Sequence, residues 1–173
     1  MPVRPIVRIG HPALRTPAQP VALARIGHQE VQALIDDMVE TMRAAPGVGL
    51  AAPQIAVPLR LVVVEYGESD EEGAPRKLYV VINPELTHAS VETEIGNEAC
   101  LSVPGLAGKV ERPQAIVIKG CNRRGRPIRL KARGWLARIF LHEIDHTDGI
   151  LYVDRASEVW KVEERPEQVV PAD

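Results

Sequence analysis

Hydrophobic residues recur along the chain with a spacing that predicts two helices. In residues 29–44 an apolar residue returns every three or four positions, as one face of a helix requires. These residues are Val31, Leu34, Ile35, Met38 and Met42. Pro46 and Gly47 follow and are expected to end this helix. Residues 134–146 form the second predicted helix, which has apolar residues around much of its circumference and Gly149 just beyond its end. Such broad apolar coverage predicts a central helix.

Shorter apolar runs predict strands. They cover residues 59–66, 77–86, 115–120, 127–132 and 150–153. The second run is expected to stop near Asn83 and Pro84, and residues 122–125 predict a hairpin turn between the third and fourth runs. We therefore expect an α+β fold with short antiparallel sheets packed around the second helix. Residues 1–155 are expected to form a single domain, followed by a polar, loosely held tail over residues 156–173.

Composition narrows the possible classes of protein. Aromatic residues make up only 3 % of the chain, so the core must consist mainly of Val, Ile, Leu and Ala. The net charge of −2 does not suggest nucleic-acid binding by bulk electrostatics, and we find no nucleic-acid-binding motif. No apolar run reaches transmembrane length, and the N-terminus lacks the apolar segment of a signal peptide. We expect a cytoplasmic protein in which Cys100 and Cys121 are free thiols or metal ligands.

Residues 142–146 read His-Glu-Ile-Asp-His and predict a catalytic metal site. Positions i and i+4 of a helix share one face, so His142 and His146 can present two imidazoles to one ion. Glu143 is placed to take a proton from a metal-bound water. This combination is typical of hydrolases that cleave amides.

A catalytic site of this kind needs a third protein ligand, for which the residues leave several candidates. The position six residues after the second histidine, where some metalloproteases have a third histidine, is Tyr152 and cannot serve. Glu163 and Glu164 lie in the weak tail, and Asp154 follows a predicted strand. The remaining candidates are the thiolates of Cys100 and Cys121.

Three segments together resemble one known family. They are Gly47-Val48-Gly49-Leu50-Ala51-Ala52-Pro53-Gln54, Glu98-Ala99-Cys100-Leu101-Ser102 and the His-Glu-Ile-Asp-His segment. The peptide deformylase family has the pattern G-x-G-L-A-A-x-Q, E-G-C-L-S and H-E-x-D-H, in the same order. The similarity extends from about Arg8 to about Arg155. It implies a peptide-deformylase-like fold and hydrolysis of the N-terminal formyl group from N-formylmethionyl peptides of newly made proteins, which releases formate.

The resemblance also implies a set of site residues. Cys100, His142 and His146 would bind one divalent ion, usually Fe²⁺, with Zn²⁺, Ni²⁺ or Co²⁺ able to take its place. Glu143 would act as general base and then as general acid. The side-chain amide of Gln54 and the backbone N–H of Leu101 would stabilise charge on the formyl oxygen.

The implied partners are nascent formyl-Met peptides at the ribosome, without a membrane. Gly49 would pair with the extended peptide, and we expect Val48 and Ile139 to form the walls of a slot for the methionine side chain. Residues 156–173 contain five acidic and two basic residues, which argues against docking to ribosomal RNA through the tail.

Two expectations concern the cysteine segment. An ion pair between Glu98 and Arg112 would support the loop that carries Cys100. Ala99 replaces the glycine that is usual in the family, which is compatible with the site only if this residue avoids positive φ.

Two other functions fit the same residues. One is a zincin-type metallopeptidase that cleaves internal peptide bonds. The other is a binding protein whose metal is purely structural, with Cys121 or Asp154 completing a closed site of four ligands.

Overall fold

The computed structural model describes residues 2–69 and 71–163. Its helices are α1 (Gln29–Ala44), α2 (Gly134–Thr147) and α3 (Tyr152–Arg155). Its strands are β1 (Gly49–Ala51), β2 (Leu61–Tyr66), β3 (Lys77–Ala89), β4 (Thr93–Cys100), β5 (Val103–Pro113), β6 (Ala115–Cys121), β7 (Pro127–Arg133) and β8 (Glu158–Lys161). Short 3₁₀ turns cover Pro12–Leu14, Leu23–Arg25 and Ala52–Ile55. The predicted α+β class is confirmed.

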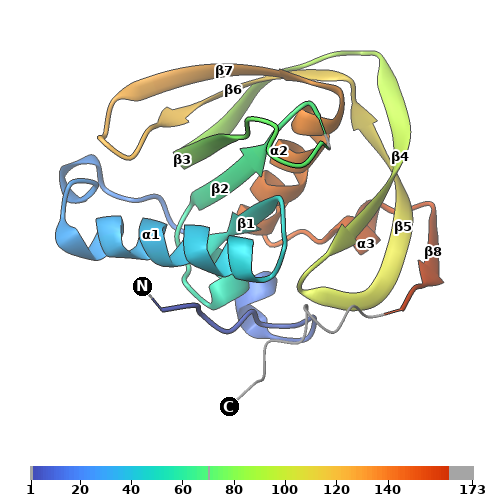
Figure 1. The fold of residues 1–173 in the computed structure, drawn as a ribbon, viewed down its shortest axis with the longest axis horizontal. Coiled ribbons are helices and arrows are strands. Elements are labelled where there is room, and N and C mark those ends of the chain that lie inside the picture. The colour runs from blue at the N-terminus through green and yellow to red at the C-terminus, as the bar shows by residue number, and fades with distance from the viewer. Residues whose placement is uncertain (1, 70, 164–173) are drawn as a thin grey trace.

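The strands form two antiparallel sheets. The larger has the order β1-β2-β3-β6-β7 and the smaller has the order β4-β5-β8. Figure 1 shows α2 between the larger sheet and the β4–β5 hairpin, while α1 lies across the other side of the larger sheet. The helix with the two histidines is therefore central, as its apolar coverage predicted.

Alternation along β2 distributes its side chains between two cores. Leu61 and Val63 pack with the apolar face of α1, whereas Val62 and Val64 pack with α2. A strand points successive side chains to opposite faces, so a continuous apolar run is needed where both faces are covered. The apolar run of β2 therefore packs against a helix on each side of the sheet.

No helix of the described residues is long and apolar enough to cross a membrane.

The strand that begins at Lys77 does not stop at Asn83 and Pro84, as the sequence suggested. It continues to Ala89, with a register irregularity between Ile82 and Glu85. Asn83 has φ of 54°, and its side chain bonds the backbone of Val21 in both directions, at 2.7 and 2.9 Å. Asparagine tolerates this left-handed conformation better than most residues. Asn83 and Pro84 therefore mark a bulge within the strand and not its end.

Two predictions for the C-terminal region were wrong. Residues 150–153 do not form a strand, because Tyr152–Arg155 is a short helix in which Asp154 Oδ2 accepts the N–H of Leu151 at 2.9 Å. The expected loose tail contains an ordered strand, β8, which pairs with β5. Residues 164–173, the rest of that expected tail, lie outside the described residues.

Candidate metal centre and active site

Two imidazoles and a thiol meet between α2 and the end of β4. His142 and His146 are one turn apart on α2, and Cys100 is the last residue of β4. The Cys100 Sγ lies 3.3 Å from the His146 Nε2. One ligand atom from each of the three residues lies within 4.8 Å of the others. A group of this size and composition could hold one metal ion, since bonds from zinc-type ions to S and N are about 2.0–2.3 Å long.

The surroundings of the two histidines suit metal ligation. The Nδ1 of His142 lies 2.9 Å from the Glu98 carboxylate, which leaves its Nε2 free for an ion. Burial alone would lower the pKa of His142, but hydrogen bonds with Cys100 and Glu98 raise it well above its ordinary value. Burial and the nearby charges of His142 and Arg112 lower the pKa of His146 and keep it neutral. His146 thus offers a neutral imidazole, whereas His142 would release its proton when a divalent ion binds.

Glu143 points into the same space from α2 and is 5 % exposed. Its Oε2 is buried and has no hydrogen-bond partner among the described residues. Burial raises the pKa of Glu143 to about 7; the charge of His142 opposes this rise and that of Glu98 adds to it. A carboxyl group with a pKa near neutrality is suited to both accepting and donating a proton.

Glu98 connects the candidate ligand His142 to a buried network of arginines. Arg112 donates two hydrogen bonds of 2.9 Å to its carboxylate, so the predicted Glu98–Arg112 pair is confirmed. Arg138 donates a third, at 2.8 Å. Burial alone would raise the pKa of Glu98, but hydrogen bonds with Arg112 and His142 bring it to about 2. The carboxylate therefore remains charged and holds the imidazole of His142 in place.

Sequence reasoning missed three members of this region. Asp145 accepts hydrogen bonds from Arg112 at 2.7 Å and from Arg155 at 2.7 and 3.0 Å. Arg138 lies one helical turn before His142, and Tyr152 stacks on His142 with ring centroids 5.9 Å apart. The position of Asp145 inside the five-residue histidine segment was the one sequence signal that could have pointed to it. Arg138 and Tyr152 contact residues from distant segments, and the sequence pattern does not connect these segments.

Gln54 lies beside the thiol and has a fixed orientation. It is 1 % exposed, and its Oε1 accepts the N–H of Ala51 at 2.9 Å. Its Nε2 therefore points toward the Ser102 hydroxyl at 3.2 Å and the Cys100 Sγ at 3.6 Å. This places an amide donor at the edge of the candidate metal centre.

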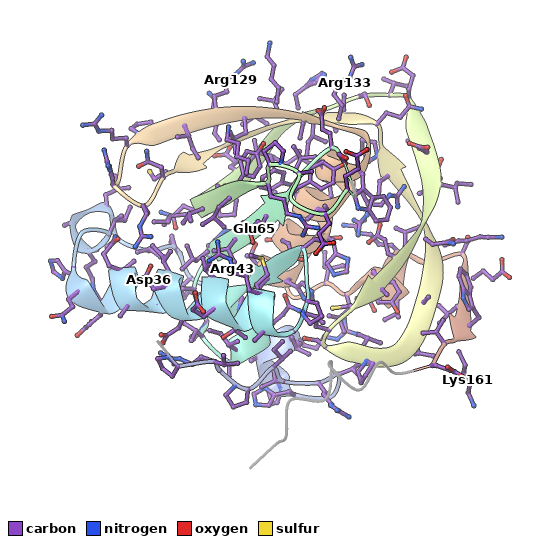
Figure 2. The ribbon with its side chains drawn as sticks, viewed as in Figure 1. Asp36, Arg43, Glu65, Arg129, Arg133 and Lys161 are labelled. Carbon is purple, nitrogen blue, oxygen red and sulfur yellow. The ribbon has the colours of Figure 1, made fainter. Side chains whose placement is uncertain are left out.

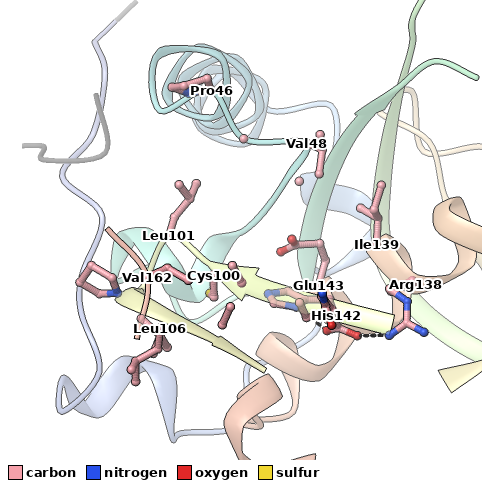
Figure 3. Close-up of a pocket in the computed structure, with 18 of the residues that line it drawn as sticks. Pro46, Val48, Cys100, Leu101, Leu106, Arg138, Ile139, His142, Glu143 and Val162 are labelled. Atoms are coloured by element: carbon pink, nitrogen blue, oxygen red, sulfur yellow. Dashed lines mark hydrogen bonds and ion pairs between the residues drawn. The ribbon is translucent and has the colours of Figure 1, made fainter. Parts of the chain in front are cut away.

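A cavity of about 490 Å³ opens onto the centre. Val48, Gly49, Leu101 and Ile139 line it together with Cys100, His142 and Glu143 (Figure 3). His146 is buried behind these residues, at 1 % exposure. The structure therefore brings the predicted ligands, the predicted base and the predicted slot residues to one place.

The rival third ligands lie elsewhere. Asp154 pairs with Arg15 and caps α3. Cys121 ends β6 and packs against the α1 core. Glu163 lines the cavity but does not belong to the group of close ligand atoms found among the described residues. Glu164 lies outside those residues.

Ala99 meets the condition set for it. The non-glycine residues with positive φ in the described parts of the chain are Ala56 and Asn83, so Ala99 has an ordinary backbone conformation. The residue is exposed and lines the cavity next to Cys100.

Comparisons with known proteins agree with this geometry. Residues 3–162 match the family profile of polypeptide deformylase. A peptide deformylase of Halothermothrix orenii is 48 % identical over 158 residues, covering 90 % of this chain and 94 % of the relative. The chloroplastic peptide deformylase 1A of Solanum lycopersicum is 45 % identical over 161 residues, which cover 87 % of this chain but only 58 % of the longer plant protein.

A solved structure has the same fold. The class I type b peptide deformylase of Acinetobacter baumannii with Met-Ala-Ser bound superposes with a TM-score of 0.83 at 35 % identity. The match covers 89 % of this chain and 98 % of that one. With the family match over most of its length, the chain belongs to the polypeptide deformylase family, whose members are metal-dependent hydrolases that remove the N-terminal formyl group.

Proposed function

We propose that this chain deformylates N-formylmethionyl peptides at the centre formed by Cys100, His142 and His146. The observation that carries the proposal is the meeting of one thiol and two imidazoles beside the buried Glu143, whose Oε2 has no hydrogen-bond partner among the described residues. A divalent ion held by these three residues would supply Lewis acidity that lowers the pKa of water to near neutrality. Sulfur and nitrogen ligands suit Fe²⁺, our first choice, and also Zn²⁺, Ni²⁺ and Co²⁺.

Glu143 moves the protons in this proposal. Its carboxylate takes a proton from the attacking water and then gives it to the leaving amine. The pKa of about 7 supports both halves of this cycle. Gln54 Nε2 and the backbone N–H of Leu101 donate hydrogen bonds to the formyl oxygen as negative charge develops on it. Ala51 supports this role, because it holds the other end of the Gln54 amide.

The peptide is proposed to lie along β1. Within the described residues this strand pairs only with β2, and Gly49 lines the cavity from its other edge. An extended peptide can add to such an edge through backbone hydrogen bonds. Val48 and Ile139 then form the walls of an unbranched apolar slot for methionine. The Met-Ala-Ser seen in the A. baumannii relative supports a peptide of this kind.

The setting of the reaction is also proposed. Formylated nascent chains would be met at the ribosome in the cytoplasm, where Cys100 and Cys121 stay reduced. A zincin-type peptidase would instead cleave unformylated peptides, and a structural metal would need a closed ligand set. The open cavity of about 490 Å³ favours catalysis over the structural alternative.

Replacing the proposed sulfur ligand tests the assignment. Cys100→Ser is expected to lower metal content far below one ion per chain after anaerobic purification, and to remove formate release from formyl-Met-Ala-Ser. Cys121→Ser is the matched control, because that thiol ends β6 away from the centre. If Cys100→Ser kept both its metal and its turnover, the ligand assignment would be wrong. Cleavage of unformylated peptides alone would favour the peptidase.

Gly49 allows β1 to approach Glu143. A Cβ at this position would lie 2.7 Å from Glu143 Oε1 and 2.9 Å from Glu143 Cγ. Gly49→Ala is therefore expected to displace the base and reduce kcat by roughly 10²-fold with metal retained. Gly27→Ala is the control, since a Cβ there meets nothing within 4 Å. Equal kcat values for the two variants would contradict the close approach.

A further inference from the structure

The sequence from 124 to 133 gives one edge of the molecule a positive charge that the net charge of −2 conceals. Five of these ten residues are basic and none is acidic. The basic residues are Arg124, Arg126, Arg129, Lys131 and Arg133, which we call the basic edge. All five are exposed. The first two lie at the β6–β7 turn, and the other three lie on β7, the outermost strand of the larger sheet.

The alternation of β7 puts its three cations on one side. Ile128, Leu130 and Ala132 alternate with them and are more buried, toward the α2 core. Alternate residues of a strand are about 6.8 Å apart, so the cations form a row. Figure 2 shows Arg129 and Arg133 projecting outward from β7, away from the rest of the molecule.

These charges have no anionic partner within residues 2–69 and 71–163. No residue of the basic edge forms an ion pair there, although Arg123, just before it, pairs with Asp36. On the neighbouring strand, Lys119 stands opposite Arg129 and adds a further cation. Glu85, opposite Lys119 on β3, is the one carboxylate at the next register position. Placing like charges opposite each other is unfavourable, so an external anion is the natural complement.

We propose that the basic edge binds the phosphate backbone of RNA. A row of unpaired cations matches a linear polyanion, whereas binding to a membrane surface normally adds apolar side chains, which β7 turns inward. The choice of RNA over DNA rests on the proposed function, because nascent chains are made on an RNA-rich particle. The row also leads to the active site: Arg133 is two residues before Trp135, which lines the cavity.

Charged residues on an edge strand have a second use, because they prevent sheets from pairing edge to edge. The two roles predict different measurements. Edge protection predicts aggregation when the charges are removed and no affinity for RNA. The RNA-binding role predicts a salt-dependent affinity that falls when the charges are removed while the protein stays monomeric.

The test is fluorescence anisotropy with a labelled single-stranded RNA of mixed sequence, titrated at several KCl concentrations. The wild-type metal-loaded protein is compared with Arg129→Gln/Lys131→Gln/Arg133→Gln. The matched control is Arg25→Gln/Lys109→Gln/Lys161→Gln, which removes three exposed cations elsewhere. We expect the first variant to bind at least about tenfold more weakly at low salt, with a salt slope smaller by about 2, and the control to bind like wild type.

Several outcomes would overturn the proposal. They are no RNA binding by the wild type, equal losses in both triple variants, or binding to phosphatidylserine vesicles in place of RNA. Turnover of free formyl-Met-Ala-Ser, expected to be unchanged in both variants, reports folding. If the wild-type protein did not turn over this peptide, the proposed function would be contradicted, whereas the RNA-binding result would still stand.

Discussion

Glu143→Gln is expected to reduce the turnover of formyl-Met-Ala-Ser by about 10²–10⁴-fold. The amide has nearly the shape of the carboxylate but cannot accept a proton from water. Because the proposed metal ligands are unchanged, metal content should remain at the wild-type level. The measurement is formate release under saturating substrate, together with metal analysis of the same preparation.

The same substitution is expected to preserve or raise thermal stability while it lowers turnover. The buried Glu143 Oε2 has no hydrogen-bond partner among the described residues, so removing its charge relieves a burial cost. We expect the thermal midpoint of Glu143→Gln to equal or exceed that of wild type. Glu92→Gln, at an exposed position, is the control and should change neither quantity. Near-normal turnover of Glu143→Gln would remove its proposed role as the base.

Arg112→Ala is expected to lower the free energy of unfolding by about 3–5 kcal/mol. Arg112 is 4 % exposed and joins the carboxylates of Glu98 and Asp145. Its loss would leave both anions in the interior without this partner, although Arg138 and Arg155 would still reach them. Since Glu98 holds His142, the ion should also dissociate faster in the presence of a chelator.

Urea denaturation and chelator-driven metal loss check this expectation. Arg25→Ala is the matched control, because its partner Glu30 is exposed and such pairs contribute only about 0–1 kcal/mol. An Arg112→Ala protein with wild-type stability and metal retention would show that the network does not support the centre. Loss of stability with normal metal retention would restrict Arg112 to a structural role.

Elements with a strong local signal were predictable from the sequence. The helix over Gln29–Ala44 and the hairpin turn between β6 and β7 appear where apolar spacing and turn residues placed them. The β4–β5 hairpin did not have such a signal, because many of its residues are exposed or charged. Its strands are held by pairing with each other and by packing of a few residues against α3, which a local pattern does not reveal.

The candidate site divides in the same way. His142, Glu143 and His146 share a helix, and helical geometry fixes their relative positions, so their sequence spacing was sufficient to group them. Cys100 could be selected from the other possible ligands only through the family resemblance, because nothing local joins it to α2. Sequence reasoning gave no role in the site to Asp145, Arg138 or Tyr152, because their partners lie on other elements.

The sequence by itself therefore determined the chemical groups, the helix that carries three of them and the family. Tertiary structure decided that β4 brings a thiol within 3.3 Å of His146 and that arginines from two elements neutralise Glu98. It also decided that five cations of residues 124–133 lie at an edge of the sheet with no ion-pair partner in the part of the chain that the structure describes. The physical reason is the separation along the sequence between interacting residues. Backbone geometry relates neighbours along one element, whereas contacts between distant segments depend on how the whole chain packs.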